Sequence, residues 1–84
     1  MTRFWPEGDP IEVVAGDNGR PLHFNWRERD HQVEEITRNW RVDTGWWAQH
    51  TWRAYFKLVT DTGMLMIIYE DLANGGWYVE RMYD

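Results

Sequence analysis

The sequence predicts an all-β domain of six antiparallel strands, arranged as a meander that closes into a small SH3-like barrel or forms a strongly curved sheet. Short runs of β-branched and aromatic residues recur along the 84-residue chain, and turn residues separate them. No segment shows a clear 3.6-residue period, which argues against helices. Closure or strong curvature also limits the exposed strand edges of a small sheet. The whole chain, residues 1–84, is therefore interpreted as a single β domain.

The first two strands are expected on either side of a tight turn. Residues 11–15 form a β-type run, and the Asn-Gly pair at residues 18–19 favours the positive φ angles of a hairpin turn. Residues 22–27 then alternate apolar and polar side chains with a period of two, as a half-buried strand does. Residues 1–9 are interpreted as an N-terminal arm that precedes the sheet.

A charged turn at residues 27–30 leads into a third, longer strand. Ile36, Trp40 and Val42 fall on one face of this strand, so Trp40 is expected in the core. Val33 is out of phase with these three positions. The sequence therefore predicts a β-bulge shortly after Val33.

Residues 44–51 interrupt the alternation and are interpreted as a loop that carries two adjacent tryptophans, Trp46 and Trp47. The fourth strand follows at residues 52–60. Its even-numbered positions are apolar and are expected to face the core, which includes Trp52. Its odd-numbered positions 53, 55 and 57 place a basic and aromatic set on the other face.

The last two strands complete the meander. Residues 64–69 are apolar on both faces, which favours a strand that is covered from two sides. A glycine-containing turn at residues 71–76 leads to a closing strand at residues 77–83. The strands at residues 11–15 and 77–83 are the candidate edges for pairing with a second copy of the chain.

Composition excludes several functional classes. The chain has no cysteine, so it forms no disulfide and offers no thiolate for metal binding or catalysis. A domain of this size without disulfides is typical of a reducing cytoplasm, and we expect that localisation. The longest apolar run, residues 64–69, is far shorter than the roughly 20 residues of a membrane span. The N-terminus has no apolar stretch that resembles a signal peptide.

Catalytic and metal sites are not expected. His23, His31 and His50 lack the spacing of a zinc site and are interpreted as surface or turn residues, although they could converge in the fold. Adjacent carboxylates on a strand point to opposite faces, so the acidic pairs do not form catalytic dyads. We therefore expect no cofactor, no metal and no enzymatic activity.

Charge and aromatic residues concentrate in the middle of the chain. The protein has a net charge of −5 and seven tryptophans, yet residues 38–57 hold four basic residues and one acid. Bases and aromatics interleave there, as in single-strand-binding proteins and in protein–protein hot spots. The predicted binding residues are Arg41, Trp46, Trp47, Arg53, Tyr55 and Lys57. We interpret them as a protein-contact surface, and the alternative is a single-stranded nucleic-acid-binding barrel that uses the same residues.

Several motifs of the chain resemble a known family. They are Trp-Arg-Val-Asp-Thr-Gly-Trp-Trp at residues 40–47, Arg-Ala-Tyr-Phe-Lys at 53–57, Ile-Tyr-Glu-Asp at 68–71 and Trp-Tyr at 77–78. Together with an opening Arg-Phe-Trp-Pro at residues 3–6, they make the whole chain resemble a family of small bacterial proteins of unassigned function.

The second half is also similar to a Gly-Trp-Trp motif near the C-terminus of inactive Y-family polymerase relatives, which belong to bacterial mutagenesis cassettes. This resemblance implies an accessory role in DNA repair or translesion synthesis, through contacts with an error-prone polymerase assembly. It implies no catalytic residues.

Overall fold

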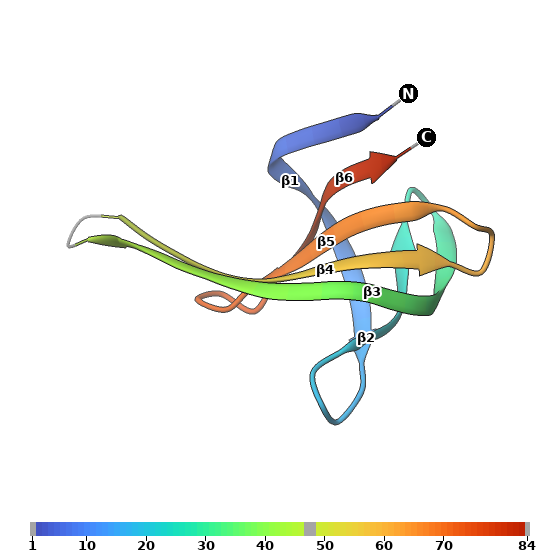
Figure 1. Ribbon diagram of the computed structural model, residues 1–84, viewed down its shortest axis with the longest axis horizontal. Helices are drawn as coiled ribbons and strands as arrows, with labels where there is room; N and C mark the ends of the chain where they lie inside the picture. The colour runs from blue at the N-terminus through green and yellow to red at the C-terminus, as the bar shows by residue number, and fades with distance from the viewer. Residues whose placement is uncertain (1, 47–48, 84) are drawn as a thin grey trace.

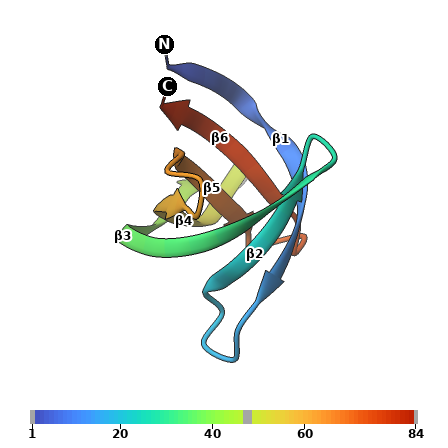
Figure 2. The same ribbon diagram turned by 90° about the vertical axis from the view of Figure 1, so that its right-hand side faces the viewer.

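The six strands of the protein form a closed meander (Figure 1). The computed structural model describes residues 2–46 and 49–83, and the side chains of all of these except residues 46, 49 and 50. The strands are β1 (Arg3–Ala15), β2 (Pro21–Trp26), β3 (Arg29–Trp46), β4 (Gln49–Thr60), β5 (Leu65–Asp71) and β6 (Trp77–Tyr83). Consecutive strands pair antiparallel and β6 pairs back with β1, so a ring results (Figure 2). The predicted all-β fold with six antiparallel strands is confirmed.

Two of the connecting turns depend on positive φ angles. In the β1–β2 turn, Gly19 has a φ of 78°, and the Gly16 amide donates to the carbonyl oxygen of Arg20 at 2.9 Å. The β2–β3 turn is shorter than the charged turn expected from the sequence, because only Arg27 and Glu28 lie between the strands. These two residues have φ angles of 54° and 64°, as a type I′ hairpin turn requires, although neither is glycine.

The N-terminal residues from Arg3 onward are part of the sheet, so residues 3–9 of the expected arm at residues 1–9 are strand instead. β1 begins at Arg3, which pairs with Met82, and Phe4 pairs with Arg81. The pairing resumes at Asp9 after a register irregularity. That irregularity hides the strand from sequence analysis, because the residues within it do not keep a two-residue alternation.

The interior of the ring is filled by one apolar cluster. It is built from β2, β4, β5 and β6, and its buried members are Phe24, Trp26, Ala54, Phe56, Leu58, Met66, Ile68 and Val79. The even-numbered positions 54, 56 and 58 of β4 point inward, as the alternation predicts. Between β2 and β1, the Trp26 indole donates to Asp9 Oδ2 at 2.8 Å and packs edge-on against Trp5.

β5 is buried on both faces, as its unbroken apolar sequence predicts. Met66 and Ile68 belong to the interior cluster, whereas Ile67 and Tyr69 belong to a second cluster with Tyr55 on the outer side of the sheet. A small barrel is expected to expose its outer face to water. The second cluster therefore marks one part of the outer face as unusual.

β3 and β4 extend beyond the ring as a two-stranded ribbon, so residues 44–46 and 49–51 of the expected loop at residues 44–51 are strands instead (Figure 1). Thr44 pairs with Thr51, and the backbone of Trp46 pairs with that of Gln49. Trp47 and Ala48 lie outside the described residues. Alternation of polarity encodes a strand that has one buried face, and a ribbon beyond the core has none, which explains why the sequence does not show it.

Two tryptophans expected in the core lie elsewhere. Trp40 packs in the outer cluster rather than the interior, and Trp52 is 40% exposed. Trp52 does share the face of Ala54, but it precedes the point where β4 enters the ring. The β-bulge predicted after Val33 is confirmed by a register shift between Val33 and Glu35. A second shift, between Ile36 and Arg38, moves Trp40 to the outer face.

Candidate interaction surface

A row of aromatic rings crosses the outer face of β3, β4, β5 and β6. Trp40, Tyr55, Tyr69 and Tyr78 are consecutive partners in the strand register. The rings of Trp40 and Tyr55 are parallel with centroids 5.3 Å apart, and the next two separations are 5.1 and 5.2 Å. Cross-strand aromatic pairs of this kind stabilise a sheet. The row explains why tyrosine occupies the non-core positions of these strands.

The centre of the row is closed to solvent. Tyr55 is 7% exposed and Tyr69 is 2% exposed. β1 contributes to this cover, because the Tyr69 hydroxyl donates to the Glu7 carbonyl oxygen at 3.4 Å. Gly8 packs so closely that an added Cβ would contact the Tyr69 hydroxyl and lie 2.7 Å from Cβ of Tyr78. The irregular part of β1 thus folds against the end of the row.

Four cations lie over aromatic rings on this same outer face. Arg53 lies 4.4 Å from the ring centroid of Tyr69, and Lys57 lies 5.3 Å from that of Tyr83. Arg81 lies 4.9 Å from the Phe4 ring and 5.9 Å from the Tyr83 ring, and Arg38 lies 5.2 Å from the Trp40 ring. Such contacts hold each charge in place while leaving it available to an anion. We call Arg38, Arg53, Lys57 and Arg81, with the rings beneath them, the cation-capped face.

Arg53 interacts with two of the tyrosines around it, Tyr55 and Tyr69. The Arg53 Nη1 donates to the Tyr55 hydroxyl at 3.1 Å, and this bond is the main reason that the pKa of Arg53 is raised above its ordinary value. Burial raises the pKa of Tyr69, and the charge of Arg53 opposes that effect. Arg53 is therefore a permanent cation, and Tyr69 is neutral at physiological pH.

Arg81 has unsatisfied hydrogen-bonding capacity. Its Nε is buried and has no hydrogen-bond partner among the residues that the structure describes. Buried donors without an acceptor are rare and costly, so each one calls for an explanation. The guanidinium lies 4.9 Å from the Phe4 ring centroid and 5.9 Å from that of Tyr83.

The sequence-predicted binding residues divide into three groups. Arg53, Tyr55 and Lys57 share the outer face, as the alternation predicts, although Tyr55 is buried beneath the cations. Arg41 is exposed on the opposite face of β3, where its charge acts on Glu70. Trp46 ends β3, but its side chain lies outside the described residues, as does Trp47.

Residues far from the basic segment complete the cation-capped face. Arg81 and Tyr83 come from β6, and Phe4 comes from β1. The sequence analysis missed them because the register that places β6 beside both β5 and β1 depends on ring closure. One signal was available: positions 67, 69, 81 and 83 carry large or basic residues on strand positions that would otherwise face water.

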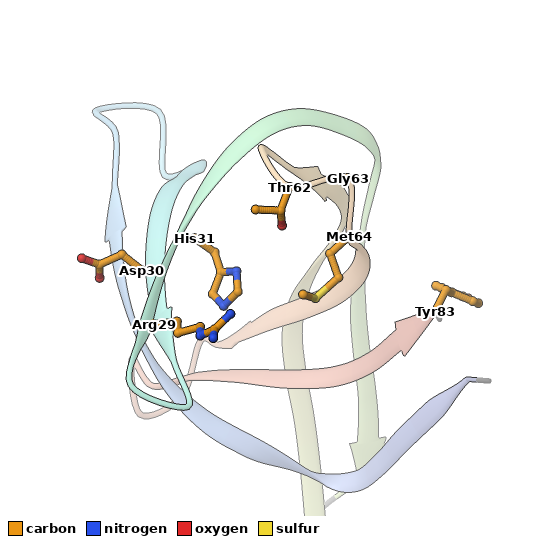
Figure 3. A pocket seen from close by; sticks show the side chains of 7 residues that line it. All are labelled: Arg29, Asp30, His31, Thr62, Gly63, Met64 and Tyr83. Atoms are coloured by element: carbon orange, nitrogen blue, oxygen red, sulfur yellow. The ribbon is translucent and has the colours of Figure 1, made fainter.

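A second candidate lies at one open end of the ring. Arg29, His31, Thr62 and Met64 point into an open hollow of about 670 Å³, whereas Asp30 and Tyr83 lie at its rim (Figure 3). His31 is 6% exposed because its ring stacks on Phe24 at a centroid distance of 5.2 Å. Stacking in the core accounts for this histidine without a ligand.

The described part of the chain contains no cluster of three or more histidine and acidic side chains that could hold a metal ion. None of its elements is a helix of the length and apolar character needed to cross a bilayer.

Comparisons with known proteins place the chain in a family and no further. No curated protein and no solved structure matches it. A family model described as a domain of unknown function, DUF6504, matches residues 1–84, which is the full length of the sequence. The fold and the cation-capped face described above therefore belong to a member of the DUF6504 family.

Proposed function

We propose that this protein is a non-enzymatic interaction module that binds an acidic segment of a partner protein through the cation-capped face. One observation carries the proposal: four cations, each held over an aromatic ring, lie together on one side of a protein whose net charge is −5. Rings that restrict the cations lower the entropy cost of ordering them on binding. The Nε of Arg81 adds a donor that lacks an acceptor within the described part of the chain.

The burial of the rings favours a protein partner over single-stranded nucleic acid. Base stacking requires exposed ring faces, and it supplies about 1–3 kcal/mol per base to single-strand binding. Tyr55 and Tyr69 are buried, and Arg38 lies over Trp40. The cation-capped face therefore presents positive charge rather than exposed rings. The protein as a whole has a net charge of −5, which opposes non-specific binding of a polyanion.

The first partners to test are the subunits of an error-prone polymerase assembly. The similarity of the second half to the Gly-Trp-Trp motif of inactive Y-family polymerase relatives supports this choice. On this proposal the protein acts as an accessory in DNA repair or translesion synthesis. Binding of each purified subunit to the immobilised protein, compared with the variant Lys57→Gln, measures whether any subunit uses the cation-capped face.

An NMR titration tests the proposed function directly. Labelled protein is titrated with a glutamate-rich peptide and, separately, with a thymidine oligonucleotide, at low and moderate salt. We expect the peptide to shift arginine Nε–H signals and the backbone of β4 and β6. We expect Lys57→Gln to weaken peptide binding about two- to fivefold, as for a partly exposed ion pair. Arg29→Gln serves as the matched control, because it removes an exposed arginine from the β2–β3 hairpin, outside the cation-capped face.

Other outcomes of the titration have defined meanings. Shifts confined to indole signals with the oligonucleotide, and a steep loss of affinity with salt, would establish the nucleic-acid alternative. Equal weakening by Lys57→Gln and Arg29→Gln would mean that only net charge matters and that the cation-capped face is not the site. Silence with both probes would contradict the proposed function.

A further inference from the structure

A second row of side chains crosses the outer face beside the aromatic row, and it runs from β3 to β1. Arg38 pairs with Lys57, and Lys57 pairs with Ile67. Arg81 pairs with Ile67 on one side and with Phe4 on the other, so the closing strand that the sequence suggested as a candidate edge is paired on both sides. Register partners of antiparallel strands point to the same face. We call these five residues the basic row: Arg38, Lys57, Ile67, Arg81 and Phe4.

Two like charges stand directly opposite each other in the basic row. Arg38 of β3 and Lys57 of β4 are register partners, and such a pair of cations destabilises a sheet by repulsion. The register partners of all three cations of the row are other cations or apolar residues. Arg53 differs, because its register partner is Asp71 and the charge of Asp71 acts on it. The basic row is therefore the part of the cation-capped face where carboxylates from a partner would relieve a repulsion.

The basic row ends on β1 at an exposed aromatic ring. Phe4 is 51% exposed, although the Arg81 guanidinium lies 4.9 Å from its ring centroid. Ile67, at the centre of the row, is buried. Aromatic residues and arginines are enriched where proteins contact one another. The row thus presents positive charge over most of its length and an apolar contact at its β1 end.

The dimensions of the basic row set the length of the segment that fits it. Neighbouring strands lie about 4.8 Å apart, so the steps from β3 through β4, β5 and β6 to β1 cover about 19 Å. An extended peptide rises about 3.3 Å per residue and turns every second side chain toward the same surface, so about seven residues span the row. The outer face of a closed ring curves across its strands, and an extended segment follows this curvature better than a straight helix does.

We propose that the acidic segment of the partner lies across the strands, along the basic row, with acidic residues at alternate positions and an apolar residue at the Phe4 end. This inference rests on the proposed function and specifies the course and the sequence pattern of the segment. Its acidic residues lie near Arg38, Lys57 and Arg81, and the apolar residue packs on Phe4. A carboxylate between Arg38 and Lys57 replaces one repulsion by two attractions.

Capped heptapeptides test the sequence pattern. The probe is Glu-Thr-Glu-Thr-Glu-Thr-Leu, which is also made in the reverse order so that both chain directions are covered, and each control has threonine in place of leucine. We expect the probe in one direction to bind about three- to tenfold more tightly than its control, because the leucine buries apolar surface on Phe4. Phe4→Ser should abolish this advantage. Leu22→Ser is the matched variant, since Leu22 is 52% exposed on β2, and it should keep the advantage.

Nitroxide labels at either end of the probe establish its course over the strands. Each label is attached through a cysteine added to the peptide, and the protein itself has no cysteine to react. We expect the label beyond the leucine to broaden amide signals most strongly around Phe4, and the label at the other end to do so around Arg38. Strongest broadening at the two ends of β4, around Arg53 and around Thr60, would show a segment that runs along a strand and would overturn the proposed course.

The repulsion between Arg38 and Lys57 can be measured without any ligand. Arg38→Gln and Lys57→Gln each remove it, together with the contact of that cation with a ring. We expect the shift in the urea midpoint of the double variant to be less favourable than the sum of the two single shifts, because the repulsion is removed only once. This difference should shrink in about 1 M salt, which screens the charges. Additive shifts would mean that the two cations do not repel, and would overturn the placement of a carboxylate between them.

The failure of this inference differs from the failure of the proposed function. Equal affinity for the probes and their threonine controls, with binding that Lys57→Gln weakens, would overturn the apolar contact at Phe4 and leave the proposed function standing. The same conclusion would follow if Phe4→Ser and Leu22→Ser lost the advantage of leucine equally. Absence of binding by the heptapeptides and by the glutamate-rich peptide would contradict both.

Discussion

Single residues on β1 control how tightly the chain closes over the aromatic row. Gly8 has a φ of 78° and lies against Tyr69 and Tyr78, so it meets two requirements that only glycine satisfies. The contact of Gly8 with these tyrosines cannot be inferred from local sequence, because Tyr69 and Tyr78 lie 61 and 70 residues further along the chain. The conformational requirement and the packing requirement can be separated by comparing two glycines.

We expect Gly8→Ala to lower the free energy of unfolding by at least about 2 kcal/mol, combining left-handed strain with overpacking. Gly19→Ala is the control, because Gly19 has the same φ of 78° but an added Cβ meets no atom within 4 Å. That variant should lose only about 1 kcal/mol. Urea unfolding of both variants measures the difference, and equal losses would mean that the contact with the tyrosines contributes nothing.

At the scale of elements, the hairpins differ in how well their sequences suit their geometry. The β1–β2 turn uses glycine at a positive φ, whereas the β2–β3 turn places Arg27 and Glu28 there. Arg27 has a compensating contact, since its guanidinium lies 4.7 Å from the Trp26 ring centroid and 5.3 Å from that of Trp5. No such contact offsets the cost at Glu28 among the interactions of the described residues.

Glu28→Gly should therefore stabilise the protein, by about 0.5–1 kcal/mol, because glycine adopts a positive φ without steric cost. Glu12→Gly makes the same substitution within β1, where it should destabilise by about 0.5–1 kcal/mol. Thermal unfolding followed by circular dichroism would show the opposite signs. A loss of stability in Glu28→Gly would mean that this carboxylate stabilises the turn more than its φ angle costs.

At the scale of the whole molecule, the β3–β4 ribbon and the partly buried carboxylate of Glu70 are the main departures from a compact barrel. The radius of gyration is 12.6 Å, slightly above the roughly 12 Å of a globular chain of this length, and the longest dimension is 42 Å. The β3–β4 ribbon accounts for this extension (Figure 1). Where the ribbon meets the ring, Glu70 is desolvated next to the inner side of β4.

Stability should depend on pH through Glu70. Burial raises the pKa of Glu70 above its ordinary value, and the charge of Arg41 only partly opposes this effect. Ionised Glu70 is thus less favourable in the folded than in the unfolded state, so the stability present at low pH is lost as pH rises through the folded pKa. Glu70→Gln should be more stable than the wild type at pH 7, and this advantage should shrink at pH 4.

Urea unfolding at the two pH values provides the measurement, and the other carboxylates cancel in the difference between variant and wild type. A variant whose relative stability is the same at pH 4 and pH 7 would contradict the proposed effect of burial on Glu70.

The sequence by itself determined the elements that have one buried face. The alternation along β2 and β4, the unbroken apolar run of β5 and the Asn-Gly turn follow from local rules of burial and backbone conformation. These rules were enough to predict six antiparallel strands, and to place Arg53, Tyr55 and Lys57 on one face. The bulge after Val33 was predictable for the same reason, since it breaks a period.

Only the tertiary structure decided what depends on pairing between distant strands. Ring closure brings Phe4 and Arg81 together, buries Tyr55 under cations, and draws residues 3–9 into the sheet. The described part of the ribbon, residues 44–46 and 49–51, escapes local patterns as well, because strands with both faces in water need no alternation. Register is a property of pairs of strands, so a one-residue shift such as that between Ile36 and Arg38 moves Trp40 from the expected core to the outer face.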